Sequence, residues 1–203
     1  MLKKMMLMAT MVTAVAAFSA PSAQAAFEAS KWSMGGTELT EAGTIEGTGQ
    51  LKFTSTSGLG GVECHVVLHL TLTAKSGTGS VTKFSTSSCM TFGFLTTVCG
   101  TDVLATPTVP WTIHAQKEGA TKRILVTAPI IHNSMLEKRA NCPNGGKIEI
   151  TGSNVANPVF ATPDSNTATT KLTLGGEVNT TLGVSKAEGT VTFSSGSGTY
   201  GIL

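Results

Sequence analysis

Charged and aromatic side chains are scarce in this sequence. Charged residues make up 13% and aromatic residues 5% of the 203 residues. Asp102 and Asp164 are the only aspartates, and the glutamates are scattered, so no close set of carboxylates suggests a glycosidase pair or a calcium loop. There is no Gly-x-Ser-x-Gly elbow, phosphate-binding loop or dinucleotide fingerprint. The sequence therefore predicts a non-enzymatic protein with no catalytic residues and no cofactor.

The N-terminal 25 residues have the pattern of an export signal. Lys3 and Lys4 give a positive start, an uncharged apolar run follows over 5–18, and Ala23-Gln24-Ala25 matches the small-x-small cleavage pattern. We expect cleavage after Ala25, which leaves 26–203 as a single domain without a transmembrane segment. The expected location is secreted, extracellular or at the cell surface, with the periplasm as the alternative.

The charge balance excludes one class of partner. Because Lys3 and Lys4 belong to the predicted signal, the remaining chain has twelve basic and twelve acidic residues. A nucleic-acid-binding protein needs an excess of Lys and Arg to displace counterions from phosphates. No nucleic-acid partner is predicted.

Four cysteines lie in the predicted mature chain, and an exported chain favours disulfides for them. A structural zinc site is the competing interpretation, but no Cys-x-x-Cys pair occurs, and no metal is predicted. The predicted disulfide residues are Cys64, Cys89, Cys99 and Cys142.

Alternation of apolar and polar residues recurs along the chain and is typical of half-buried strands. Gly, Pro, Asn and Ser turns separate the alternating runs. This pattern predicts an all-β fold, an antiparallel β-sandwich or jelly-roll-like single domain. The flanks 26–36 and 194–203 are predicted to be flexible ends, or segments that pair with the sheet edge of a neighbouring molecule. The predicted strands are 44–54, 64–72, 109–115, 124–130, 147–151, 169–174 and 190–194.

The turn at 75–77 allows one disulfide pairing to be favoured. A three-residue loop with Gly77 left-handed sets Leu68 opposite Phe84 and brings Cys64 beside Ser88, and a two-residue loop sets Cys64 opposite Cys89. Either register favours Cys64–Cys89 with Cys99–Cys142. The other two pairings stay open, because a β-bulge would re-aim a cysteine.

Histidine and tryptophan supply the remaining candidate site residues. His65 and His69 are four residues apart, but on a strand this spacing is roughly 13 Å, too long for both to bind one metal unaided. We interpret them as solvent-facing. Trp32 and Trp111 are candidates for ligand contact, although the alternating run around Trp111 also favours a core position.

Three segments resemble small exported bacterial β-proteins. The segments 99–112 and 141–152, with a Pro-Trp strand start and a Cys-Pro-Asn-Gly turn, resemble the alkane-oxidation protein activator family. The segment 32–39 resembles the W-x-x-x-G-x-x-L opening of a group of uncharacterised actinobacterial exported proteins. The resemblance implies an extracellular all-β protein that contacts hydrophobic substrates or the cell surface. Cys89 departs from the activator pattern.

These features predict a non-enzymatic secreted or cell-surface protein. Its expected partners are copies of itself, in a homo-oligomer or matrix fibre, or components of the cell surface, since a net charge near zero removes repulsion between copies. One alternative is a binding module for carbohydrate or hydrophobic ligands. Another is a hydrolase whose residues converge only in the fold.

Overall fold

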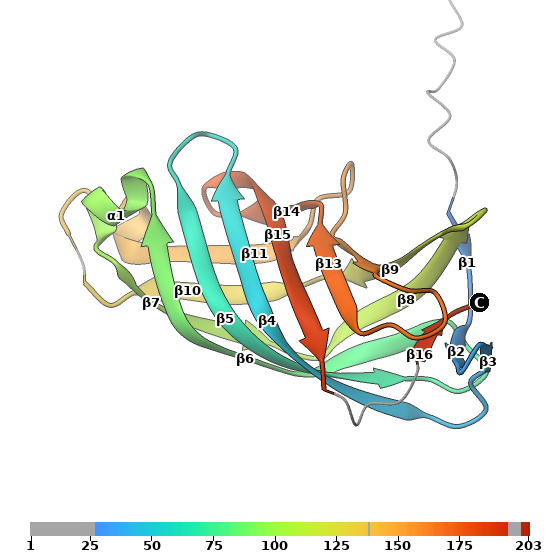
Figure 1. Cartoon of the computed structure of the whole chain (residues 1–203). Helices are drawn as coiled ribbons and strands as arrows, with labels where there is room; N and C mark the ends of the chain where they lie inside the picture. Colours follow the sequence, from blue (N-terminus) through green and yellow to red (C-terminus); the bar gives the residue numbers. More distant parts are fainter. Residues whose placement is uncertain (1–26, 138, 195–199) are drawn as a thin grey trace, which may run out of the picture.

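A computed structural model describes residues 27–137, 139–194 and 200–203, and it confirms the prediction of an all-β antiparallel fold (Figure 1). The predicted export signal lies outside the described residues. Four long strands run along the molecule: β4 (Gly43–Ser55), β5 (Gly61–Leu72), β6 (Thr78–Phe92) and β15 (Gly183–Phe193). Eight shorter strands complete the walls: β7 (Asp102–Thr108), β8 (Trp111–Glu118), β9 (Thr121–Thr127), β10 (Ile130–Met135), β11 (Lys147–Ser153), β12 (Phe160–Pro163), β13 (Lys171–Gly175) and β14 (Glu177–Thr180).

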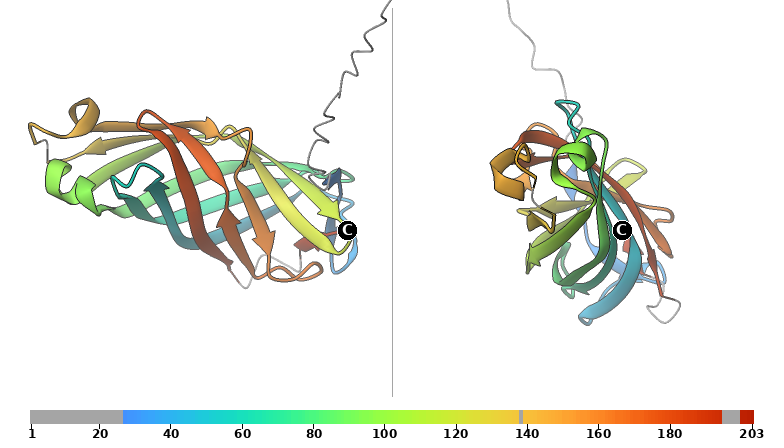
Figure 2. Two further views of the ribbon diagram at one scale, coloured as in Figure 1. Left: turned by 90° about the horizontal axis from the view of Figure 1, so that it is seen from above. Right: turned by 90° about the vertical axis from the view of Figure 1, so that its left-hand side faces the viewer.

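The shorter strands join end to end in pairs. Both β7 and β8 pair with β6, so they form one interrupted path along it. In the same way, β13 and β14 form one path along β15. The strands β9 and β10 form another path beside β8 and β7, and β12 and β11 form a further path beside β9 and β10. Together with the four long strands there are eight paths, each beside the next in chain order. Because β15 also pairs with β4, the paths close into a cylinder, and Figure 2 shows its elongated shape.

The inner side of this cylinder is filled by apolar side chains. Along β5, the predicted inward residues Cys64, Val66, Leu68, Leu70 and Leu72 are all buried. They belong to a cluster of buried side chains to which all the walls contribute. This burial of one face of each strand stabilises the fold and leaves the polar residues of the alternating pattern on the outside.

Each end of the cylinder is closed by local structure. At one end lie α1 (Phe94–Cys99) and a 3-10 turn (Pro143–Gly146). At the other end β1 (Glu28–Ala29) pairs with β8, and β2 (Trp32–Met34) lies between β3 (Thr37–Glu38) and β16 (Tyr200–Ile202). The described parts of the two flanks therefore pair with the domain and with each other.

The structure contains the favoured disulfides, Cys64–Cys89 and Cys99–Cys142. The predicted pairing of Leu68 with Phe84 is also present. The left-handed residue of the preceding turn is Lys75, with φ 55°, and not Gly77 as expected. Two irregularities in the β5–β6 register, near Thr82 and Ser88, bring Cys89 to Cys64.

Candidate functional site

The structure buries both tryptophans that were candidates for ligand contact. Trp32 is 2% exposed and its Nε1–H donates to the carbonyl O of Thr78 at 2.6 Å. Trp111 is 6% exposed, donates to the carbonyl O of Thr108 at 2.5 Å, and packs on Phe84 with 4.7 Å between the ring centroids. A buried indole that has found a hydrogen-bond acceptor is a core residue. The structure therefore places both candidate residues in the core.

The interior of the cylinder contains a small apolar cavity. Its volume is about 70 Å³, and Phe84, Trp111 and Ile113 are among its lining residues. An apolar cavity of about 150 Å³ is the size that accommodates benzene. The internal cavity is therefore too small for an alkane chain or a lipid. A binding site for a larger ligand has to lie on the outer surface.

The two histidines of β5 lie on the outer face with different neighbours. Nε2 of His65 lies 3.4 Å from Nε2 of Gln50, while Nε2 of His69 lies 3.7 Å from Oε2 of Glu46. Across the described part of the chain, no three His, Cys, Asp or Glu side chains gather where they could hold one metal ion. The structure therefore places the histidines in a polar surface that extends over several strands.

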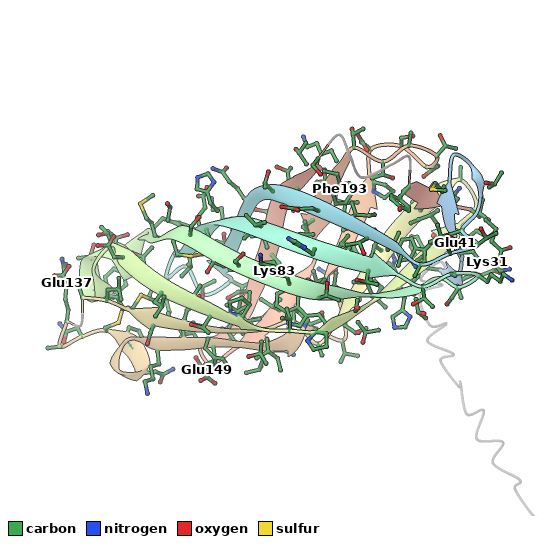
Figure 3. The ribbon with its side chains drawn as sticks, turned by 90° about the horizontal axis from the view of Figure 1, so that it is seen from below. Lys31, Glu41, Lys83, Glu137, Glu149 and Phe193 are labelled. Atoms are coloured by element: carbon green, nitrogen blue, oxygen red, sulfur yellow. A yellow bond between two sulfur atoms is a disulfide. The ribbon has the colours of Figure 1, made fainter. Side chains whose placement is uncertain are left out.

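Register brings polar side chains from five strands into one row across that surface. Thr173 pairs with Thr190, Thr190 with Gln50, Gln50 with His65, and His65 with Ser87. Because neighbouring strands lie about 4.8 Å apart, the row is roughly 19 Å long. It presents hydroxyl, amide and imidazole groups and contains no carboxylate, lysine or arginine. Figure 3 views the outer face of β4, β5 and β6, where Lys83 lies outside this row.

A hollow of about 470 Å³ lies on this row, and we call it the polar hollow. Val66 contributes to its lining although the Val66 side chain is buried in the core. Apart from Gly49 and Val67, the other lining side chains are polar. The lining residues are Thr48, Gly49, Gln50, His65, Val66, Val67, Ser87, Thr190 and Thr192.

Glycines explain how the wall bends at the polar hollow. A Cβ on Gly49 would lie 1.9 Å from the carbonyl O of Thr190, and one on Gly189 would lie 2.2 Å from the carbonyl O of Gln50. Both positions face inward, where no side chain would fit between the two strands. Glycine therefore permits β4 and β15 to coil closely around each other, and the polar hollow lies on the outer side of this contact.

Charged residues lie beside the polar hollow in a compensated group. The Nζ of Lys186 pairs with the carboxylate of Glu188, and Glu188 is opposite Lys52 in the β15–β4 ladder. The hydrogen bond and charge of Lys186, with the charge of Lys52, hold the pKa of Glu188 below its ordinary value. A ligand in the polar hollow therefore meets neutral groups, with ion-paired charges at the margin.

The aspartates do not converge on this surface. Asp164 follows β12, where its carboxylate accepts hydrogen bonds from the backbone N–H groups of Thr170 and Lys171 at 2.9 and 3.0 Å. Asp102 begins β7, near α1.

The polar hollow was not predicted from the sequence because its residues come from separate strands, and only the register of those strands aligns them.

Comparisons with protein-family models, with curated proteins and with solved structures give no match. In the described part of the chain, no helix has the length and apolarity to span a lipid bilayer. The two disulfides are typical of an oxidising compartment outside the cytoplasm.

Proposed function

We propose that this chain is a non-enzymatic binding module of an extracytoplasmic compartment, and that it binds a neutral carbohydrate polymer in the polar hollow. The observation that carries this proposal is the row of Thr173, Thr190, Gln50, His65 and Ser87, brought into register by five strands. Such groups both donate and accept hydrogen bonds, as sugar hydroxyls do.

The chemistry of the polar hollow favours a neutral ligand. No carboxylate, lysine or arginine lines it, so a charged polymer would gain no ion pair there. Val67, whose side chain is partly exposed, can contact the C–H groups of a sugar ring. Since no aromatic ring lines the polar hollow, binding depends on hydrogen bonds, each worth about 0.5–1.5 kcal/mol net. A polymer that engages the whole row would bind better than a single sugar.

The other predicted functions have less support from the fold. Self-association through free sheet edges is disfavoured because the long strands of the described chain have neighbours on both sides. Binding of a hydrophobic ligand by an exposed tryptophan is disfavoured because both rings are buried. Contact with hydrophobic substrates, which the family resemblance implies, would have to use a surface other than these.

Affinity electrophoresis through gels containing soluble neutral polysaccharides tests the proposal. We expect α-glucan, β-glucan or mannan gels to retard the protein, and alginate, an acidic polymer, to retard it less. The double variant Thr48→Val/Gln50→Ala should weaken retardation by about tenfold, since it removes at least two hydrogen-bonding groups. Thr44→Val is the matched control, because Thr44 is an exposed residue of the same strand outside the polar hollow. Equal loss in both variants, or no retardation by any neutral polymer, would refute the proposal.

A further inference from the structure

Exposed apolar side chains gather at the end of the cylinder that carries α1. Met90 is 56% exposed, Leu104 56% and Leu136 66%, and Phe94 of α1 is also exposed. Exposed apolar residues that occur singly need no explanation, whereas a group of neighbours marks an interaction surface.

Strand pairing shows that three of these side chains surround one carboxylate. Met90 of β6 is opposite Asp102 of β7. On the other side of β7, the N–H of Leu136 donates to the carbonyl O of Asp102 at 3.0 Å. Leu104 follows two residues along β7 and so lies on the same face as Asp102. Since opposite side chains are about 5 Å apart and diagonal ones about 7–8 Å, the four form one surface, which we call the α1-end patch.

The α1-end patch is acidic as well as apolar. Glu63 of β5 is opposite Met90, which adds a second carboxylate to the row that contains Asp102. Glu137 follows Leu136 at the tip of the molecule (Figure 3), and its charge is paired with Arg139 at 3.1 Å. Neither Asp102 nor Glu63 has an ion-pair partner within the described residues. Lys52 of β4 is opposite Glu63 in the β4–β5 ladder, whereas the cross-strand neighbours of Asp102 are Met90 and Leu136. The charge enclosed by the apolar side chains is therefore that of Asp102, and it is negative.

The backbone under the α1-end patch is held in place covalently. Cys89, which precedes Met90, is bonded to Cys64. Cys99 of α1 is bonded to Cys142, and Arg139 donates from Nη1 to the carbonyl O of Thr97 at 2.7 Å. A surface fixed before binding loses less conformational entropy when a partner docks.

We propose that the α1-end patch is the docking surface for a cationic, amphipathic segment of a partner protein. Lys or Arg side chains of that segment would pair with Asp102 and Glu63, while its apolar side chains would cover Met90, Leu104 and Leu136. A second copy of this chain fits less well, because a two-fold contact centred on this patch would bring Asp102 close to its own copy. An anionic lipid surface is repelled by the same carboxylates.

Fluorescence anisotropy with two labelled peptides of equal length tests this proposal. One peptide is an amphipathic helix of Leu and Lys, and the other replaces every Lys by Glu. We expect the Lys peptide to bind, with an affinity that falls as salt is added, and the Glu peptide to bind at least tenfold more weakly. Leu104→Ser/Leu136→Ser should abolish binding, and Asp102→Asn should weaken it by about two- to fivefold, the effect of one partly exposed ion pair.

Matched controls separate docking from general attraction to acidic or apolar surfaces. Val155→Ser removes an almost fully exposed apolar side chain elsewhere, and Glu149→Gln removes an exposed carboxylate on β11. Both should bind the Lys peptide as the parent protein does, as should Thr48→Val/Gln50→Ala. Equal binding of the two peptides, or equal loss in test and control variants, would overturn the proposal. So would finding that Leu104→Ser/Leu136→Ser abolishes only dimer formation or only binding to anionic phosphatidylglycerol vesicles.

Discussion

The close contact between β4 and β15 predicts that Gly49→Ala strongly destabilises the protein. A Cβ at this position would lie 1.9 Å from the carbonyl O of Thr190, and backbone atoms cannot turn aside as a side chain can. The two strands would have to separate locally, which costs about 1–3 kcal/mol for overpacking and about 1 kcal/mol for each of roughly two lost ladder hydrogen bonds. We expect a total of about 3–5 kcal/mol, a large part of the stability of an ordinary domain.

Urea unfolding followed by tryptophan fluorescence measures this loss. Gly175→Ala is the matched control, because Gly175 also lies in a strand and its Cβ would meet only the ring of Phe160, at 3.2 Å. The control should shift the free energy of unfolding by less than about 1 kcal/mol. If the two variants unfold at the same urea concentration, β4 and β15 do not approach as described, and our explanation of the bend at the polar hollow is wrong.

Two further predictions concern the disulfides and Asp164. The bonds Cys64–Cys89 and Cys99–Cys142 span 25 and 43 residues. Replacing both cysteines of a pair by serine should lower the free energy of unfolding by about 3.5 kcal/mol for the first bond and about 4 kcal/mol for the second. An unchanged urea midpoint in either variant would contradict this. Burial opposes ionisation of Asp164, but hydrogen bonds from the Thr170 hydroxyl and neighbouring N–H groups prevail and lower its pKa. A lowered pKa stabilises the fold above the unfolded value of about 4, and this contribution is lost as the pH falls through the folded value. Asp164→Ala should therefore lower the free energy of unfolding at pH 7, with a smaller difference from the parent in acid; a difference that grows below pH 4 would contradict this account.

Strand positions were predictable wherever burial imposes a strict period of two. The predicted strand 44–54 lies within β4, and the predicted strand 64–72 lies within β5. The inward positions of 64–72 and the pairing of Leu68 with Phe84 follow from the same alternation. This register was sufficient to favour the disulfide between Cys64 and Cys89 before the structure was known.

Strand β6 was harder to recognise because its alternation is interrupted. The β5–β6 register shifts near Thr82 and again near Ser88, which changes the face on which later side chains lie. The predicted strand 124–130 is also wrong at its end, because Ala128 has φ 50° and Pro129 follows it, so β9 ends at Thr127.

Closure of the sheet could not be predicted, because it depends on contact between the first and last long strands. The pairing of Gly49 with Val191 joins residues more than a hundred positions apart, and neither strand identifies its partner by alternation alone. The polar hollow depends on the same long-range register. From the sequence alone, the residues of the polar hollow are therefore interpreted only as solvent-facing positions of separate strands.

The closed fold limits where this protein can bind a partner. The cylinder is filled by apolar side chains, its internal cavity is about 70 Å³, and local structure closes both ends. Binding at the surface must therefore depend on outward side chains, which can vary without changing the core. Along that surface the polar hollow has neutral hydrogen-bonding groups, whereas the α1-end patch combines Asp102 with apolar side chains. Because these two surfaces lie on different strand segments, each can be altered by substitution while the other is retained, so the two proposals can be tested separately on the same molecule.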